Sequence, residues 1–100
     1  MDKQHCAACA RHTERSEEEK RKLENRLSRI EGQVRGLRHM IEEDAYCNDV
    51  LIQSAAALAA LKAFNRELLH AHLNHCVVRD IREGKPEVAE ELMRTLEKLM

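Results

Sequence analysis

The chain has 100 residues with one Phe, one Tyr and no Trp, so a single copy has little bulky side-chain material for a core, and we expect subunits to associate. Charged residues make up 35% and nearly cancel to a net charge of -1, which excludes a strongly basic protein. The longest apolar run, residues 55–61, is far too short to span a membrane, and the N-terminus lacks the apolar stretch of a signal peptide. We therefore expect a cytoplasmic protein whose four cysteines stay reduced and serve as ligands or reactive thiols.

The N-terminal segment, residues 1–15, is polar and lacks hydrophobic periodicity. We predict that it is a flexible tail, separate from a helical domain over residues 16–100. The tail carries His5, Cys6, Cys9 and His12, and a Cys-x-x-Cys pair binds metals readily by itself. Three interpretations stay open for these four residues: an accessory metal site, an extra ligand for another site, or no role.

The first helix is predicted over residues 16–43. Ser16 followed by Glu19 is the sequence signature of a capping box at a helix N-terminus. Gly32 and Gly36 lie one turn apart and would let a neighbouring helix approach closely, at a cost in helix propensity of about 1 kcal/mol each. Apolar residues recur at alternating steps of four and three, which is typical of a helix that pairs with others: Leu23, Leu27, Ile30, Val34, Leu37 and Ile41.

Two further helices follow. Asn48 or Asp49 can cap the second helix, which should continue until Gly84 ends it. Pro86 suits the first turn of a shorter third helix, whose apolar residues recur on one face. No stretch has the alternation of a strand, so we predict an all-α fold with three helices per protomer.

Three soft metal donors stand out in the second helix. His72 and Cys76 are four residues apart, so they lie on the same face of a helix one turn apart. Cys47 lies roughly 44 Å away along a continuous helix, out of reach of the other two. Two such helices running antiparallel about a two-fold axis would bring Cys47 of one subunit to His72 and Cys76 of the other. The sequence therefore predicts an antiparallel dimer with one intersubunit metal site per subunit.

The donor types bear on the identity of the metal. Two thiolates and one imidazole favour Cu(I), which accepts low coordination numbers, whereas Zn(II) would need a fourth ligand. A simpler interpretation makes Cys76 a small buried hydrophobic residue and His72 a surface histidine. The placement of Cys47 where an antiparallel partner would deliver it favours the metal site.

Three sequence stretches carry a resemblance to a known family. RLSRIEGQVRG at residues 26–36, Tyr46-Cys47, and HLNHCV at residues 72–77 are similar to the CsoR/RcnR family of bacterial metal-responsive repressors, over about residues 20–100. Cys followed by His-x-x-x-Cys resembles the copper-sensing branch of that family. The resemblance implies a four-helix-bundle dimer that assembles as a dimer of dimers, binds operator DNA without metal, and releases it on binding Cu(I), derepressing copper-resistance genes.

The resemblance also implies roles for individual residues. Cys47 of one subunit and His72 with Cys76 of the other would bind Cu(I). Tyr46 matches the tyrosine beside the first cysteine, and either Glu90 or Glu91 would orient the metal-bound histidine by a hydrogen bond. Ordinary solvated surface is the competing interpretation for Tyr46 and for both glutamates.

Contacts with operator DNA must come from basic side chains, because the sequence contains no helix-turn-helix. Basic residues outnumber acidic ones over residues 20–38, although such a run is usually only a solvated face. A tetramer would repeat this stretch four times, and phosphate neutralisation accumulates with each basic residue engaged. The predicted contacts are Lys22, Arg26, Arg29, Arg35 and Arg38, with Lys62 as an addition.

Other functions remain as alternatives. The same scaffold could sense nickel or cobalt, in which case Ni(II) would have to recruit His5 or His12, or a thiol-reactive signal such as sulfide or formaldehyde, which would not need His72. A metal buffer without DNA binding is a further alternative. A thiol enzyme in which His72 activates Cys76 would lack a group to orient the histidine and an oxyanion loop. We therefore expect no enzyme activity and no small-molecule substrate.

Overall fold

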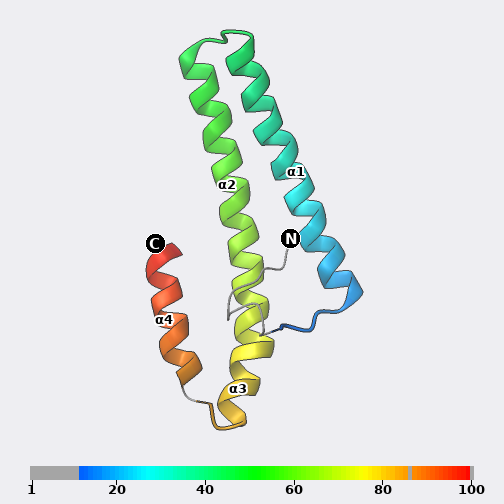
Figure 1. Ribbon diagram of the computed structural model, residues 1–100, viewed down its shortest axis with the longest axis vertical. Helices are drawn as coiled ribbons and strands as arrows, with labels where there is room; N and C mark the ends of the chain where they lie inside the picture. Colours follow the sequence, from blue (N-terminus) through cyan, green and yellow to red (C-terminus); the bar gives the residue numbers. More distant parts are fainter. Residues whose placement is uncertain (1–11, 86, 100) are drawn as a thin grey trace.

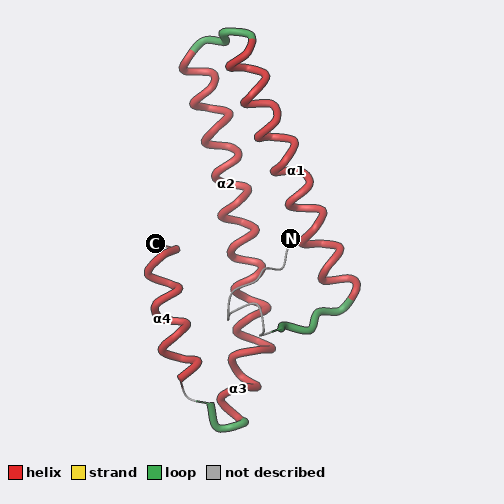
Figure 2. The backbone as a smooth tube through the Cα atoms, viewed as in Figure 1, coloured by secondary structure: helices red, strands yellow, loops and turns green. Residues whose placement is uncertain are grey.

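The computed structural model of the chain describes residues 12–85 and 87–99, and these residues are helical apart from short connections (Figure 1). The tube in Figure 2 shows helical rods joined by loops, with no strand in the described part of the chain. The first and third rods are single helices, and the second is continuous through three elements. In chain order the elements are α1 (Glu17–Glu42), α2 (Cys47–Ala71), the π-helical segment η2 (His72–Val77), α3 (Val78–Arg82) and α4 (Glu87–Leu99).

The N-terminus of α1 is fixed by the predicted capping box. The Ser16 hydroxyl accepts a hydrogen bond from the Glu19 backbone N–H at 3.1 Å. Glu19 Oε1 in turn accepts one from the Ser16 backbone N–H, also at 3.1 Å. Each side chain thus satisfies a backbone donor that the helix itself leaves without a partner, which confirms the predicted start.

The start of α2 differs from the prediction. Its N-cap is Tyr46, whose side chain makes no capping hydrogen bond, so the prediction that Asn48 or Asp49 caps this helix was wrong. The reason is a tight turn after α1, in which Asp44 adopts a φ of 56° and the Ala45 N–H bonds to the Met40 carbonyl at 2.9 Å. The turn delivers the chain to the helical conformation directly after Tyr46, and Cys47 becomes the first residue of α2.

Gly84 ends the second rod, as predicted. Its φ of 80° lies in the left-handed region that glycine enters without strain. The Gly84 N–H bonds to the Ile81 carbonyl at 3.1 Å and the Lys85 N–H to the Asp80 carbonyl at 2.9 Å, which satisfies carbonyls at the end of α3. The chain then reverses, and α4 runs back beside the lower part of the second rod (Figure 1).

The core of the described chain lies at one end only. Cys76, Val77 and Val88 are the buried hydrophobic residues there, at 6%, 5% and 4% exposure, and they come from η2 and α4. The α1–α2 hairpin contains no buried residue. The molecule measures 55 × 27 × 25 Å. It is elongated because α1 and α2 run side by side along its length, beyond the end that α4 covers (Figure 1).

Only alternate members of the apolar series along α1, here called the α1 seam, are covered within the chain. Leu23, Ile30 and Leu37 are half-buried, since α1 packs on α2. The alternate members Leu27, Val34 and Ile41 are 39%, 53% and 64% exposed. The apolar pattern of α1 therefore predicts a larger packing surface than α2 of the same chain covers. No helix in residues 12–85 and 87–99 combines the length and apolar character needed to cross a membrane.

Candidate metal centre

The segment that carries two of the predicted metal ligands is a π-helical turn. His72 is the first residue of η2, and Cys76 is next to its last. Single π-helical turns inside α-helices occur often at functional sites. Here the turn joins α2 to α3 without a break, so the second rod stays continuous while its hydrogen-bonding pattern changes over His72–Val77.

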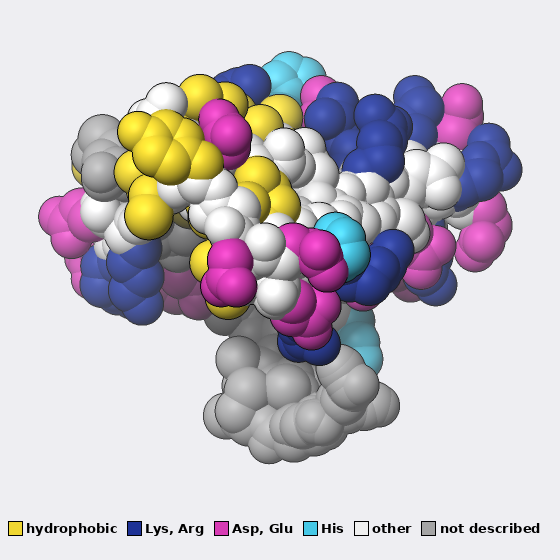
Figure 3. All heavy atoms as spheres, turned by 90° about the horizontal axis from the view of Figure 1, so that it is seen from above, with side chains coloured by type: hydrophobic (Ala, Val, Ile, Leu, Met, Phe, Trp, Pro, Cys, Tyr) yellow, Lys and Arg dark blue, Asp and Glu magenta, His cyan; other side chains and the backbone are white. Residues whose placement is uncertain are grey.

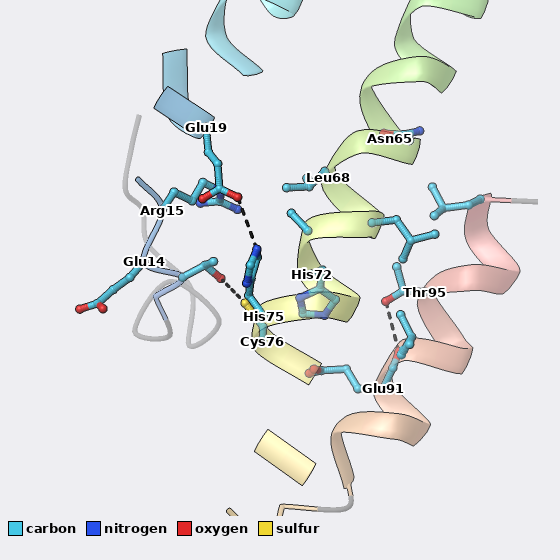
Figure 4. A pocket seen from close by; sticks show the side chains of 15 residues that line it. Glu14, Arg15, Glu19, Asn65, Leu68, His72, His75, Cys76, Glu91 and Thr95 are labelled. Carbon is cyan, nitrogen blue, oxygen red and sulfur yellow. Dashed lines mark hydrogen bonds and ion pairs between the residues drawn. The ribbon is translucent and has the colours of Figure 1, made fainter. Parts of the chain in front are cut away.

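His72 and Cys76 lie close together on one side of the rod. Both line the same two neighbouring cavities, which lie between η2, α4 and the residues that precede α1, and Figure 4 shows the first of the two. His72 is half-buried, and Cys76 is buried at 6% exposure. The Cys76 thiol donates a hydrogen bond to the Thr13 hydroxyl at 3.7 Å. The structure thus brings two of the three predicted soft donors to a shared, partly enclosed space.

Cys47 lies at the opposite end of the rod. As the first residue of α2 it is exposed beside the turn to α1, next to Tyr46, which is 73% exposed. Within residues 12–85 and 87–99, no group of three or more His, Cys, Asp or Glu side chains is arranged to hold a metal ion. A single chain therefore does not assemble the three predicted ligands.

The two candidate glutamates of α4 occupy different surroundings. Glu91 is half-buried and lines both cavities together with His72 and Cys76, and Figure 4 shows its carboxylate on the side of His72. The Glu90 side chain is 81% exposed and pairs with Arg94 at 3.2 Å. Of these two residues, only Glu91 lines the cavities that contain His72.

Two contacts to this region come from before and within the first turn of α1, and sequence reasoning missed them. Besides the Thr13 contact, Glu19 Oε2 lies 3.6 Å from His75 Nε2 (Figure 4). Thr13 and Cys76 are 63 residues apart, and no local pattern in the sequence links such distant positions. The capping box identified Glu19 as a helix-start residue without indicating its second partner.

Of the tail residues proposed as accessory ligands, His12 is among the described residues. His5, Cys6 and Cys9 lie outside the described residues. His12, the first described residue, is exposed and lines the second cavity with His72 and Cys76. The end of the tail that the structure describes thus lies beside the candidate metal centre.

The basic residues of α1 divide into two groups. Lys22 and Arg26 line one hollow, and Arg26 and Arg29 line the next along the helix. Nine residues separate Arg26 from Arg35, and Arg29 from Arg38, which is about two and a half helical turns and places the second pair on the opposite side. Lys62 is exposed on α2. Viewed from above, Lys and Arg side chains gather over the α1 side of the molecule (Figure 3).

Comparison with known sequences gives a consistent picture. The family described as metal-sensitive transcriptional repressor matches residues 19–98. The copper-sensing transcriptional repressor CsoR of Bacillus subtilis (strain 168) is 46% identical over 85 residues, covering 84% of each chain. The copper-sensing transcriptional repressor RicR of Mycobacterium tuberculosis is 56% identical over 61 residues, covering 61% of this chain and 64% of RicR.

Solved structures share the fold. The copper-sensing repressor CsoR with Cu(I) from Geobacillus thermodenitrificans NG80-2 is 44% identical, with a TM-score of 0.83 over 87% of this chain and 92% of that one. The nickel-responsive transcriptional regulator InrS is 39% identical, with a TM-score of 0.69 over 89% and 98%. Because the matched proteins are transcriptional regulators, the expectation that this chain is not an enzyme is confirmed. The family match over residues 19–98 and the identity to the Bacillus repressor over most of the chain show that this protein belongs to the CsoR family of metal-sensitive transcriptional repressors.

Proposed function

We propose that this chain is a copper-sensing transcriptional repressor that binds operator DNA without metal and releases it when Cu(I) binds, derepressing copper-resistance genes. A repressor of this kind acts on DNA in the cytoplasm. The observation that carries the proposal is the division of the soft donors: His72 and Cys76 share one cavity, while Cys47 is exposed at the far end of the same rod. The copper-sensing relatives from Bacillus and Mycobacterium support the choice of metal.

The residues present fit Cu(I). Two thiolates and one imidazole form a soft set, and a low coordination number leaves no requirement for a fourth protein ligand. Glu91, beside His72, is suited to accept a hydrogen bond from the imidazole nitrogen that does not bind metal, which would fix the ring orientation. Tyr46 lies next to Cys47 and, in a dimer, would reach the same site from the other subunit.

An antiparallel dimer would complete both the site and the core. Half of the α1 seam is exposed, and the α2 residues Leu51, Ile52 and Leu58 are 66%, 62% and 55% exposed. Apolar surface left open in this periodic way is typical of helices that pack on a partner. A Cβ atom added at Gly36 would meet nothing within 4 Å, so no neighbour within the described chain requires a glycine here. The open space leaves room for a helix of a second copy to approach closely.

A second interface would then join two dimers into a tetramer. Val78, Ile81 and Met93 are 40%, 51% and 62% exposed on α3 and α4, away from the hairpin seam. We propose that these residues contribute to contacts between dimers. The tetramer would present the basic side chains of α1 four times, which suits a protein that binds duplex DNA without a helix-turn-helix.

Nickel sensing on the same scaffold is a second candidate, because InrS shares the fold and His12 lies at the cavity that contains His72. Ni(II) prefers more nitrogen ligands than the central set provides. Anaerobic competition titrations with Cu(I) and Ni(II) test the choice of metal. We expect tight uptake of one Cu(I) per subunit, and a preference for Ni(II) would reject the copper assignment.

Complementation between inactive subunits tests the intersubunit site. Cys47→Ala and Cys76→Ala should each abolish tight Cu(I) uptake as pure proteins. In a mixed heterodimer, intact Cys47 of one chain faces intact His72 and Cys76 of the other, so one of the two sites is complete. Equal mixing and subunit exchange should restore about one quarter of the wild-type capacity. No recovery, together with normal mixing shown by mass spectrometry, would contradict a site built across subunits. Cys9→Ala serves as a control for the tail and should retain the site.

A further inference from the structure

A hollow on the flank of α1, here called the flank hollow, contains two guanidinium groups and one buried amide oxygen. Arg26, Arg29 and Gln33 line it from α1, and Ala60 lines it from α2, which runs beside α1 (Figure 1). No acidic side chain is among these four residues. No ion pair of the described chain includes Arg26 or Arg29. The flank hollow therefore carries positive charge that residues 12–85 and 87–99 do not neutralise.

The amide of Gln33 lacks a partner in the folded chain. Its Oε1 atom is buried and accepts no hydrogen bond from the described residues. A buried acceptor without a donor is destabilising, because it gives up its bonds to water and gains none. Ala60 has only a methyl group, so the side chain by which α2 lines the hollow offers no donor. The fold thus holds a polar group at a cost in stability, and a role in binding accounts for it.

Arg29 can supply the missing donor. It lies four residues before Gln33, and side chains at this spacing are neighbours on a helix surface. Arg29 is exposed, so its guanidinium is free to lie over the hollow. A guanidinium has five N–H donors in a fixed plane, so it can give one to the Gln33 oxygen and two to an anion. The hollow therefore has the composition of a phosphate site in which the amide fixes the direction of the arginine.

The proposed dimer leaves the flank hollow open. Adjacent residues on an α-helix point about 100° apart. Leu27 and Val34 belong to the exposed half of the α1 seam, and each directly follows a residue of the hollow, Arg26 or Gln33. The seam that we assign to a second copy therefore points to a different side of α1, and the hollow stays available to DNA.

We propose that Gln33 is a positioning residue for operator DNA, whose buried oxygen accepts a hydrogen bond from the Arg29 guanidinium when that group engages a phosphate of the duplex. This inference rests on the proposed function, in which basic residues of α1 bind operator DNA. The hydrogen bond forms in the complex, so it contributes to DNA affinity and not to the stability of the free protein. Gln33 itself carries no charge and touches no phosphate in this scheme.

Substitutions that preserve the shape of the side chain test this role. Gln33→Met keeps the length and helix propensity of the side chain while it removes the buried oxygen. Gln53→Met is the matched control, because Gln53 is also half-buried but belongs to α2 and does not line the hollow. Arg29→Gln and the Arg29→Gln/Gln33→Met double variant complete a double-mutant cycle. Each full-length, metal-free variant is titrated over a range of salt against a fluorescent duplex that the wild-type apo protein has selected from a random pool. Thermal unfolding is measured for each variant as well.

We expect Gln33→Met to lower DNA affinity about tenfold, because it removes a hydrogen bond to a charged group. The slope of its log affinity against log salt should move toward that of Arg29→Gln, since an arginine that is no longer held in place neutralises phosphate less well. The midpoint of its thermal unfolding should equal or exceed that of the wild type, because the unpartnered oxygen is gone. The double variant should bind no more weakly than Arg29→Gln alone, and Gln53→Met should bind like the wild type.

Wild-type DNA affinity in Gln33→Met would overturn the inference. So would additive losses in the double variant, or a lowered unfolding midpoint with an unchanged salt slope, which would mark Gln33 as a packing residue. A wild-type protein that selects no duplex would reject the proposed function itself. If Arg29→Gln weakens binding and Gln33→Met does not, the proposed DNA contact stands and only the positioning role fails.

Discussion

The two ends of the long second rod differ in how completely one chain covers them. At the hairpin end, Cys47 is exposed, and Leu51 and Ile52 nearby are 66% and 62% exposed. At the other end, η2 and α4 together bury Cys76, Val77 and Val88. One end is packed and holds two candidate ligands, whereas the other is open and holds one. Folding of a single chain therefore brings together two of the three proposed ligands and leaves the third to association.

The largest expected effect comes from placing a charge on the exposed apolar face that we assign to the dimer interface. Val34 lies in the exposed half of the α1 seam at 53% exposure, so Val34→Asp should place a charge in the proposed dimer interface. An unpaired buried charge costs several kcal/mol, which should dissociate the dimer and abolish Cu(I) uptake. Sedimentation velocity would measure the oligomeric state, with the exposed Ser28→Asp as control. A Val34→Asp protein that sediments like the wild type would exclude this face as an interface.

At the packed end, a substitution should lower the free energy of unfolding instead of dissociating the subunits. Val88 is 4% exposed, so Val88→Ala removes two buried methyl groups and should lower the free energy of unfolding by roughly 2 kcal/mol. Val78→Ala on α3 is the comparison: the side chain is 40% exposed in a single chain, so the loss should be smaller unless the proposed contacts between dimers bury it. Thermal unfolding by circular dichroism compares the two. Equal losses would mean that association covers Val78 as completely as folding covers Val88.

A sharper comparison concerns the two glutamates of α4. Glu91 lines the cavities beside His72, whereas Glu90 points to solvent and pairs with Arg94. Glu91→Gln should weaken Cu(I) binding about tenfold, because residues that hydrogen-bond a metal-bound histidine typically contribute that much. Glu90→Gln should leave it nearly unchanged. The chelator competition used for the wild type measures both, and the opposite order would assign the role to Glu90.

The smallest expected effects distinguish the two sides of α1. Arg29 belongs to the group with Lys22 and Arg26, and Arg38 lies on the opposite side of the helix. Removing one phosphate contact lowers the slope of log affinity against log salt by about one for each copy engaged. Comparing Arg29→Gln with Arg38→Gln over a range of salt identifies the side that faces DNA. Equal slopes, both below that of the wild type, would mean that the duplex contacts both sides.

The sequence was sufficient for features that depend on local chemistry. The capping box at Ser16, the stop at Gly84 and the three-rod all-α architecture follow from residue types and spacings, and the structure confirms them. The start of α2 was predicted wrongly because the turn at Asp44 fixes the backbone before Asn48 can act as a cap. A residue with a positive φ that is not glycine leaves little trace in a sequence.

The candidate site was predictable in part. The spacing of His72 and Cys76 placed them together on one face, and the structure gives them a common cavity. The π-helical turn was not foreseen, because no residue type marks it. Which of Glu90 and Glu91 lines the cavity with His72 depends on the loop before α4, and the contact between Thr13 and Cys76 depends on the tertiary fold.

The length of the second rod has a genetic consequence. If every sensor site combines Cys47 of one polypeptide with His72 and Cys76 of another, then each site takes its ligands from two polypeptides, which two different alleles can encode. In a cell that carries a wild-type and a Cys76→Ala allele, every mixed dimer would keep one faulty site and could still hold the operator. Such an allele should act as a dominant, copper-insensitive repressor, although its own chain folds normally and carries an intact Cys47.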